Sequence, residues 1–535
     1  MSGLISSSLQ FLFVLMILFC HPLCFDVLKA FYDFCIKSNS SSTCKKPILY
    51  VDSDILFHFY SVIYWTLFIL TSFLLPFLKS YIQCGNFTIS SKVKRAIIDN
   101  LVYYGVSLTL TIKLERTSIK TLIITTSNTW GLFMLICFLG YGLVNFPRSL
   151  WQKSSPGNSM RLSFFKISRL NLDMTNDEHV FLLAVSKVNY LKNSIPMNEE
   201  LEKYSQVILR NFDQFKNLLN DNNTVLPTDF KIDKTELEKL NIELKKSGSK
   251  YHRTRSLLSD TLTAAAYYQD VTMNMDLKNN QDQFKPIHEL ERGLFNKFSR
   301  FNYLWHCVLI QNILKCCSII SGLGTILIIW SECLFFIRSP KLSIPAVLLD
   351  TMYKHGNSSL IALTTFVMMG YIGICVFYSV YNLKIYGFYR LLRNHLSDEV
   401  SLLFCATLLT RLIPALCLNT LGLTHLDFQR GGASGPETAY TRFMGHLEII
   451  PFIANGFNIY FPIIIIFLCL IAYFELGARI LRFIGIPQLI KNSNDLNASK
   501  ELSDVDQDVL DCIEEGRITL NQTRRKERFS SDQIA

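Results

Sequence analysis

Residues 121–146 read TLIITTSNTWGLFMLICFLGYGLVNF, and Pro147, Arg148 and Trp151 follow directly. About 20 predominantly apolar residues are enough to cross a bilayer as a helix, which satisfies its own backbone hydrogen bonds where lipid offers none. Proline, arginine and tryptophan after such a segment are typical of an interface with the cytoplasm. The stretch therefore predicts a transmembrane helix that stops at Pro147.

Apolar segments of this kind recur on both sides of a long polar stretch over residues 148–300. Of 535 residues, 50% are hydrophobic and 18% charged, against the roughly 25% charged residues of average soluble proteins. The predicted spans are Leu9–Leu28, Leu56–Leu78, Ala96–Ile112, Thr121–Phe146, Cys317–Ile337, Ser358–Tyr381, Val400–Leu421 and Pro451–Phe474. We therefore expect an all-α polytopic transmembrane protein with about eight spans in two halves and a helical or coiled-coil cytosolic insertion.

Four regions follow from this pattern. They are a first transmembrane half (1–147), a cytosolic helical or coiled-coil region (148–304), a second transmembrane half (305–484) and a disordered cytosolic tail (485–535). The tail carries the basic run Arg524–Arg528, and the chain has a net charge of +10. In a membrane protein such charge is retained on the cytoplasmic side, so it indicates anionic lipid as the partner and argues against nucleic acid.

The cytosolic region carries two helical patterns. Helical spacing links Leu201, Tyr204, Ile208, Phe215 and Leu219, and a seven-residue repeat links Leu237, Leu244, Tyr251, Leu258 and Ala265, with Leu240 between. These patterns predict an antiparallel helical hairpin or a short coiled coil, interrupted around Asn220–Thr228. Polar Ser247 and Thr254 weaken the repeat. Both a self-packed lobe and a coiled coil that binds a partner remain open.

The amino-terminal segment allows two interpretations. Leu9–Leu28 is either a span or a cleaved signal peptide, and cleavage would leave a seven-span receptor. In the loop that follows, Cys35 and Cys44 flank the sequon at Asn39. This arrangement suits an oxidising, extracellular or lumenal face, so we predict a Cys35–Cys44 disulfide and glycosylation at Asn39.

Polar side chains inside the spans are the candidates for function. Arg411 lies near the middle of its span, and Glu332 lies near the outer end of another. We expect Arg411 to form a structural ion pair with Glu332 or contacts with carbonyl groups, and a ligand or ion site is the alternative. Asn128 is expected to form hydrogen bonds between helices, with close packing at Gly131.

No pattern in the sequence indicates catalysis. A Walker loop, a nucleophile elbow and a zinc-protease helix are all missing from it. The 15 cysteines form no C-x-x-C pair, and His425 with Asp427 supplies too few ligands for a metal. Gly140-Tyr141-Gly142 has no pore loop around it. We therefore expect a protein that is not an enzyme and needs no cofactor or metal.

Several longer motifs point to a known family. They are NTWGLF (Asn128–Phe133), GYGLV with PRS-x-W (Gly140–Trp151), WSEC-x-FF (Trp330–Phe336), SLLF (Ser401–Phe404), R-L-x-P-x-LCLN-x-LGLTH (Arg411–His425) and TAYT-x-x-MG (Thr438–Gly445). Their most distinctive residues are Trp130, Gly131, Gly140, Gly142, Pro147, Arg148, Trp151, Trp330 and His425. With these motifs the chain resembles the limb region (LMBR-like) family of multipass membrane proteins over nearly its whole length.

The resemblance implies a non-enzymatic function. Family members of the most similar kind regulate adrenergic G-protein-coupled receptor signalling at the plasma membrane, which would make the cytosolic helical region the contact with receptors. Other members imply an alternative, a transporter or an escort or receptor for a small molecule or a lipocalin-type ligand, with an endolysosomal location. No ligand-binding residue is carried over by the resemblance.

Overall fold

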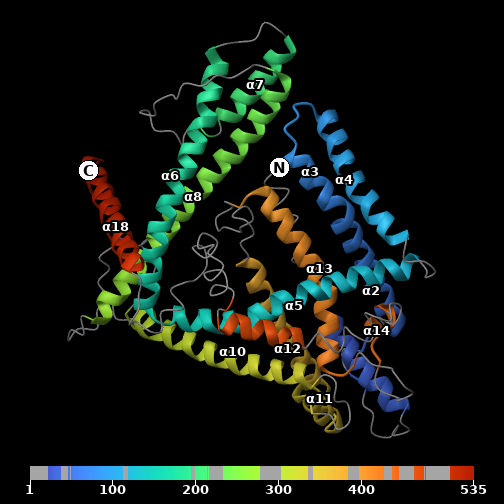
Figure 1. Cartoon of the computed structure of the whole chain (residues 1–535). Helices are drawn as coiled ribbons and strands as arrows, with labels where there is room; N and C mark the ends of the chain where they lie inside the picture. Colours follow the sequence, from blue (N-terminus) through green and yellow to red (C-terminus); the bar gives the residue numbers. More distant parts are fainter. Residues whose placement is uncertain are drawn as a thin grey trace.

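The computed structural model describes residues 22–37, 46–47, 50–112, 119–193, 199–213, 215, 233–276, 303–334, 342–382, 397–426, 437–444, 463–474, 476 and 507–534. Every regular element within these ranges is a helix (Figure 1). The predicted all-α class is therefore confirmed.

Five helices in the described part of the chain are long and apolar enough to cross a membrane. The first, Ser53–Gln83, joins α2 (Ser53–Ile69), η1 (Leu70–Leu74) and α3 (Leu75–Gln83). The others are Thr129–Lys153 in α5 (Ile119–Lys153), Leu304–Cys333 made of η4 (Leu304–Leu309) and α10 (Ile310–Cys333), α12 (Ser358–Tyr381) and α13 (Glu399–Leu423). Each overlaps a predicted span, which confirms the polytopic architecture.

The three remaining predicted spans are not among the five helices of the described part that are long and apolar enough to cross a membrane. Ala96–Ile112 lies in α4 (Ile89–Ile112), which is not among the five. Residues 22–28 and the short apolar helix Ile463–Tyr473 are the helical parts described of the other two. Two further short helices, α11 (Ile344–Lys354) and α14 (Ala439–Met444), complete this part of the molecule.

Helix α5 lies at the centre of the membrane bundle and packs against α10, α12 and α13. Leu135, Leu139 and Leu143 of α5 are fully buried in this core. By contrast, Ile320, Leu323 and Ile326 of α10 are 62–69% exposed. An apolar face that the described residues leave largely exposed suits the hydrocarbon of a bilayer.

The polar region forms a long arm, which we define as α6 (Pro156–Asn193), α7 (Glu199–Asp213) and α8 (Lys234–Asp276). In Figure 1, α6 and α8 lie side by side over most of their length. At about 1.5 Å per residue, the 43 residues of α8 extend about 65 Å. All six residues of the predicted repeat, from Leu237 to Ala265, are buried.

The main partner of α8 differs from the one that the sequence predicts. The expected hairpin pairs α8 with residues 201–219, whereas most of the α8 seam packs against α6, with Phe181, Val185 and Val188 buried between them. Helix α7 covers one end, where Ile208 is fully buried. The run Val180–Val185 in α6 is apolar at every position, so a periodic pattern does not reveal which face forms the seam.

The end of the chain is also more ordered than the sequence indicates. We expect a disordered tail over residues 485–535, but Gln507–Ile534 forms α18, which packs on α6. Leu520 is buried in this contact. At Gly516 a side chain would collide with the carbonyl oxygen of Phe164, so glycine permits the close approach.

Candidate functional site

Arg411 is held by serine hydroxyl groups. Its guanidinium donates to the Oγ of Ser72 at 3.0 Å and of Ser127 at 3.5 Å. Ser72 lies in the π-helical turn η1, and such turns often occur at functional positions. The arginine thus links α13 to the first span and to α5 in the middle of the bundle.

The expected pair between Arg411 and Glu332 is not formed. Glu332 is fully buried and accepts a hydrogen bond from Asn419 Nδ2 at 3.2 Å. Asn419 follows Arg411 by eight residues on α13, or about 12 Å along the helix, so the carboxylate is too far towards the other end. The second oxygen of Glu332, Oε2, has no hydrogen-bond partner among the described residues.

The NTWGLF motif positions α5 against Arg411. A side chain at Gly131 would lie 2.8 Å from the backbone oxygen of Arg411, so glycine is required for this contact. Trp130, the residue before Gly131, is 50% exposed. Asn128 lies within α5, but its side chain is outside the described residues, so its bonding remains a prediction.

Gly140 and Gly142 also serve close packing. A side chain at Gly140 would meet Leu468 at 2.7 Å, and one at Gly142 would collide with the backbone of Cys375 on α12. Nearby, Ser379 donates to the carbonyl oxygen of Phe138 at 2.7 Å. The glycines therefore allow α5 to contact two neighbouring helices at once.

Pro147 does not end its helix, contrary to the expected stop. Helix α5 continues to Lys153. Proline has no N–H, so the carbonyl group of Leu143, four residues earlier, loses its helical hydrogen bond. The hydroxyl of Thr325 on α10 donates to that carbonyl oxygen at 2.7 Å, and a neighbouring helix thereby replaces the missing donor.

The residues after Pro147 join α5 to the last apolar helix. Arg148 Nη2 donates to the carbonyl oxygen of Tyr473 at 2.8 Å, at the end of the helix Ile463–Tyr473. Trp151 is 52% exposed, as is Trp330 at 53% near the other end of the bundle. Exposed tryptophans at both ends of apolar helices are typical of membrane interfaces.

His425 ends α13. It has a positive φ of 56°, its N–H donates to Gly422, and the N–H of Leu426 donates to Leu421. This is the Schellman arrangement that closes many helices. Asp427 lies outside the described residues, and nothing follows about its distance from His425.

Asp26 is a buried carboxylate that the sequence patterns above do not single out. Its two oxygens each accept a hydrogen bond, at 2.8 Å, from the N–H groups of Ala439 and Tyr440 at the start of α14. The hydroxyl of Tyr440 then donates to the carbonyl oxygen of Pro414. An acidic residue at the end of an apolar segment was the available signal.

The loop near the amino terminus is described only in part. Cys35 is disulfide-bonded. Cys44 and Asn39 lie outside the described residues, so their pairing and glycosylation remain predictions.

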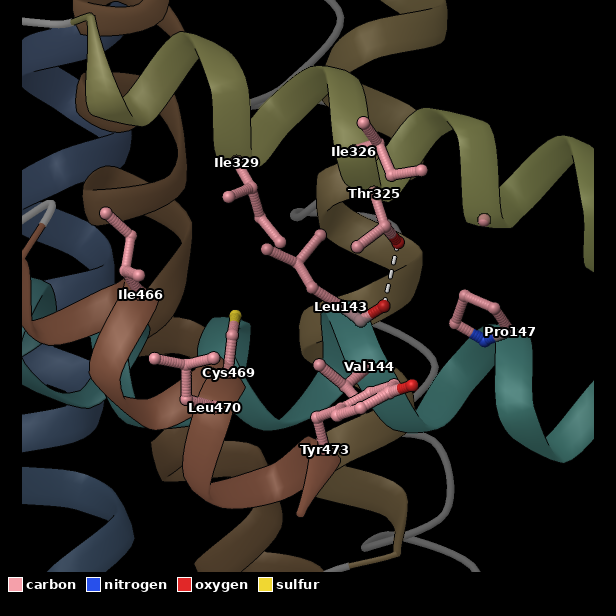
Figure 2. Close-up of a pocket in the computed structure, with 11 residues that line it drawn as sticks. Leu143, Val144, Pro147, Thr325, Ile326, Ile329, Ile466, Cys469, Leu470 and Tyr473 are labelled. Atoms are coloured by element: carbon pink, nitrogen blue, oxygen red, sulfur yellow. Dashed lines mark hydrogen bonds between the residues drawn. The ribbon is translucent and has the colours of Figure 1, made fainter.

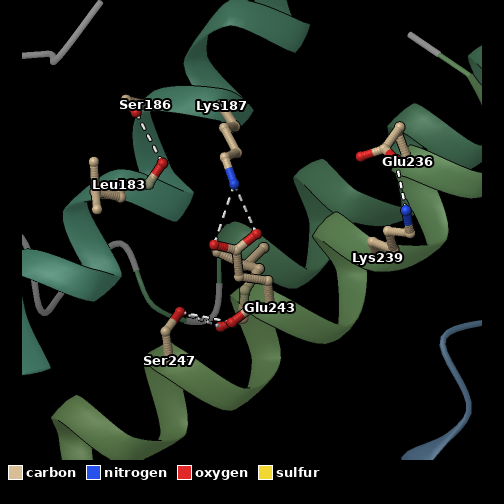
Figure 3. A network of polar contacts seen from close by, with 8 residues as sticks. Leu183, Ser186, Lys187, Glu236, Lys239, Glu243 and Ser247 are labelled. Atoms are coloured by element: carbon tan, nitrogen blue, oxygen red, sulfur yellow. Dashed lines mark hydrogen bonds and ion pairs between the residues drawn. The ribbon is translucent and has the colours of Figure 1, made fainter. Parts of the chain in front are cut away.

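Polar contacts join α6 and α8, and Figure 3 shows one group of them. Lys187 of α6 forms an ion pair with Glu243 of α8 at 2.9 Å. Deeper in the seam, Asp177 accepts from Thr254 at 2.7 Å and pairs with Lys250 at 2.6 Å. Asp177 therefore satisfies one of the two polar residues that interrupt the predicted repeat.

The tip of the arm docks on the loop that follows the first span. Asn241 Nδ2 donates to the carbonyl oxygen of Gly85 at 3.0 Å, and Asn86 donates to Glu238 at 3.2 Å. Next to them, the rings of Phe87 and Tyr204 stack with centroids 4.5 Å apart. These contacts join α7 and α8 to the first half of the bundle.

The other end of α8 contacts the second half of the bundle. The hydroxyl of Tyr267 lies 3.0 Å from Nδ1 of His306 at the start of the span Leu304–Cys333. The arm thus bridges the two transmembrane halves at one end of the bundle.

Lys245 of α8 lies between the two ends of the arm. Burial lowers the pKa of Lys245, nearby Lys92 lowers this pKa further, and Glu399 opposes the shift.

Fold and site together define a multipass helical membrane protein whose two halves are bridged by a long helical arm. A family model described as LMBR1-like membrane protein matches residues 4–477. The chain belongs to this LMBR1-like family.

Named relatives agree with this membership. "G-protein coupled receptor-associated protein LMBRD2B" of Danio rerio is 32% identical over 523 residues, 92% of this chain and 71% of the relative. "G-protein coupled receptor-associated protein LMBRD2" of Homo sapiens is 32% identical over 86% of this chain and 70% of the relative. "LMBR1 domain-containing protein 2 homolog" of Drosophila melanogaster is 30% identical over 90% of this chain and 74% of the relative. No solved structure matches the chain.

Proposed function

We propose that this chain is a non-enzymatic, receptor-associated regulator of G-protein-coupled receptor signalling, with adrenergic receptors at the plasma membrane as its partners. The names of its vertebrate relatives support the association with receptors. The observation that carries the mechanism is the arm, which projects from one end of the membrane bundle. On this proposal that end is the cytoplasmic one, where receptors present their intracellular loops.

The contact surface that we assign to receptors is an apolar stripe on α6. Leu172, Val180 and Tyr190 are 49%, 50% and 42% exposed there. At about 100° per residue they fall within about 80° of one another around the helix. Exposed apolar side chains on one face suit an amphipathic helix of a partner.

Co-purification with an adrenergic receptor tests this surface. The variant Leu172→Ser/Val180→Ser/Tyr190→Ser removes the stripe but leaves the buried seam of the arm intact. We expect it to capture at least tenfold less receptor than the wild-type chain at equal surface expression. Deleting residues 220–260 is a poorer test, because it removes buried Leu237 and Leu244 and therefore disrupts the arm itself.

A matched control lies on α18. Leu510 and Ile518 are 48% and 49% exposed, so Leu510→Ser/Ile518→Ser makes a similar polar change away from the stripe. We expect normal receptor capture with this control. Equal capture by the α6 variant and the wild-type chain would rule out the stripe as the contact.

Glu332 favours a second function, transport or escort of a small molecule or a lipocalin-type ligand. A buried carboxyl group with an oxygen that lacks a partner among the described residues is a candidate for binding a proton or solute. Glu332→Gln keeps the shape and the bond to Asn419. Loss of uptake by this variant with normal folding would support transport, whereas normal uptake would leave Glu332 a packing residue.

A further inference from the structure

A groove with a volume of about 350 Å³ lies between three apolar helices, α5, α10 and the helix Ile463–Tyr473 (Figure 2). Its walls include Leu143 and Val144 of α5, Gly322 and Ile326 of α10, and Leu470 and Tyr473 of the third helix. The side chains that line it are almost entirely apolar. A water-filled site would need more polar partners than these walls offer.

The groove opens on the side that faces lipid. Ile326, Leu470 and Tyr473 line it, and they are 65%, 48% and 61% exposed on membrane-spanning or apolar helices. At Gly322 a side chain would meet no atom within 4 Å, so the space over this residue is open. A molecule in the surrounding bilayer can therefore enter sideways.

A positive charge lies beside one end of the groove. Pro147 and Tyr473 form this end, and Arg148 follows Pro147 directly. The guanidinium donates to the carbonyl oxygen of Tyr473, and its carbon lies 5.8 Å from the centre of the Tyr473 ring. The charge thus stands where the apolar walls stop, at the end of the bundle from which the arm projects.

We propose that this groove binds one acyl chain of an anionic phospholipid, with the phosphate-containing headgroup at Arg148. From Gly322 to Ile329 the groove follows seven residues of α10, or about 10 Å, which fits within one leaflet of a hydrocarbon core about 30 Å thick. Bilayer hydrocarbon is as apolar as the walls, so the selectivity comes from the arginine.

Native mass spectrometry of the purified full-length chain tests the proposal. The protein is mixed with equal amounts of phosphatidylserine and phosphatidylcholine that carry the same chains. We expect the wild-type chain to retain phosphatidylserine about fivefold over phosphatidylcholine, the preference that one basic residue at a membrane surface provides. Arg148→Gln should bring the ratio close to one, and Arg148→Lys should preserve it.

The apolar wall is tested separately. A Cβ at Gly322 meets no atom within 4 Å, so we expect the side chain of Gly322→Leu to extend into the groove and the variant to lose both bound lipids. Gly370→Leu on α12 is the matched control, because a side chain there also meets no atom within 4 Å and Gly370 does not line the groove. If Gly322→Leu lowers expression, Ile326→Trp fills the groove from its exposed face instead.

Three results would overturn the assignment. They are wild-type lipid retention by a folded Gly322→Leu protein, an unchanged headgroup ratio in Arg148→Gln, and displacement of the phospholipid by free palmitate at equal concentration. The last result would identify a fatty-acid site in place of a phospholipid site. None of these readouts depends on a receptor, so the lipid site and the proposed signalling function can fail independently.

Discussion

The hydroxyl of Thr325 donates to the carbonyl oxygen of Leu143, the group that Pro147 deprives of its helical hydrogen bond. A side chain on α10 thus compensates for a proline on α5, as Ser and Thr side chains of neighbouring helices do within membrane bundles. This relationship explains why α5 continues past Pro147 and carries the chain directly into the arm.

The Thr325–Leu143 bond predicts an energetic coupling between two positions. Thr325→Val should lower the free energy of unfolding by about 1 kcal/mol, which is within the range found for hydrogen bonds between membrane helices. Pro147→Ala restores the N–H for Leu143, so Thr325→Val should cost much less in that background. Melting of all four proteins in detergent measures the coupling, and additive effects would contradict it.

The close contact between Gly85 and α8 is expected to hold the tip of the arm on the bundle. A side chain there would lie 2.6 Å from the backbone oxygen of Glu238, so Gly85→Ala should cost about 1–3 kcal/mol and loosen the tip. Hydrogen exchange should accelerate about tenfold in the first turns of α8. Gly157→Ala is the control, because a side chain at Gly157 meets nothing within 4 Å. Equal exchange in both variants would show that the loop does not hold the arm.

The buried polar contact in the arm should be replaceable as a pair. Thr254→Val removes one partner of Asp177, whose side chain is 6% exposed, and should destabilise the arm by about 1–3 kcal/mol. Asp177→Leu/Thr254→Val makes this part of the seam apolar and should recover most of that loss. Thermal unfolding followed by circular dichroism compares them. A double variant that is less stable than Thr254→Val would contradict this prediction and show that the polar contact stabilises the arm more than apolar packing does.

The sequence predicts those parts of the fold that depend on local patterns. Apolar length identifies the spans, and the seven-residue repeat from Leu237 to Ala265 identifies the buried face of α8. It does not identify α6 as the partner, because Phe181 and Val185 lie in the run Val180–Val185, which is apolar at every position and therefore marks no single helical face. Helix α18 is missed for another reason, since its contact depends on Gly516 and a few apolar residues in a polar tail.

For the candidate site, the sequence identifies the charged residue but not its partners. A charged residue within a span must find a partner, so Arg411 can be singled out, but which hydroxyls face it depends on how the helices are rotated. Ser72 and Ser127 look like any other serine in an apolar span. Thr325 could have been sought from Pro147, because a proline within a span requires a donor on a neighbouring helix.

The cyclic-AMP response to a catecholamine agonist tests the central claim most directly. It is measured in cells depleted of their own relative of this protein and then given the wild-type chain, the α6 stripe variant or the α18 control. We predict that depletion alters the response, that the wild-type chain and the control restore it, and that the stripe variant does not. An unchanged response after depletion, or full restoration by the stripe variant at equal surface expression, would contradict the account.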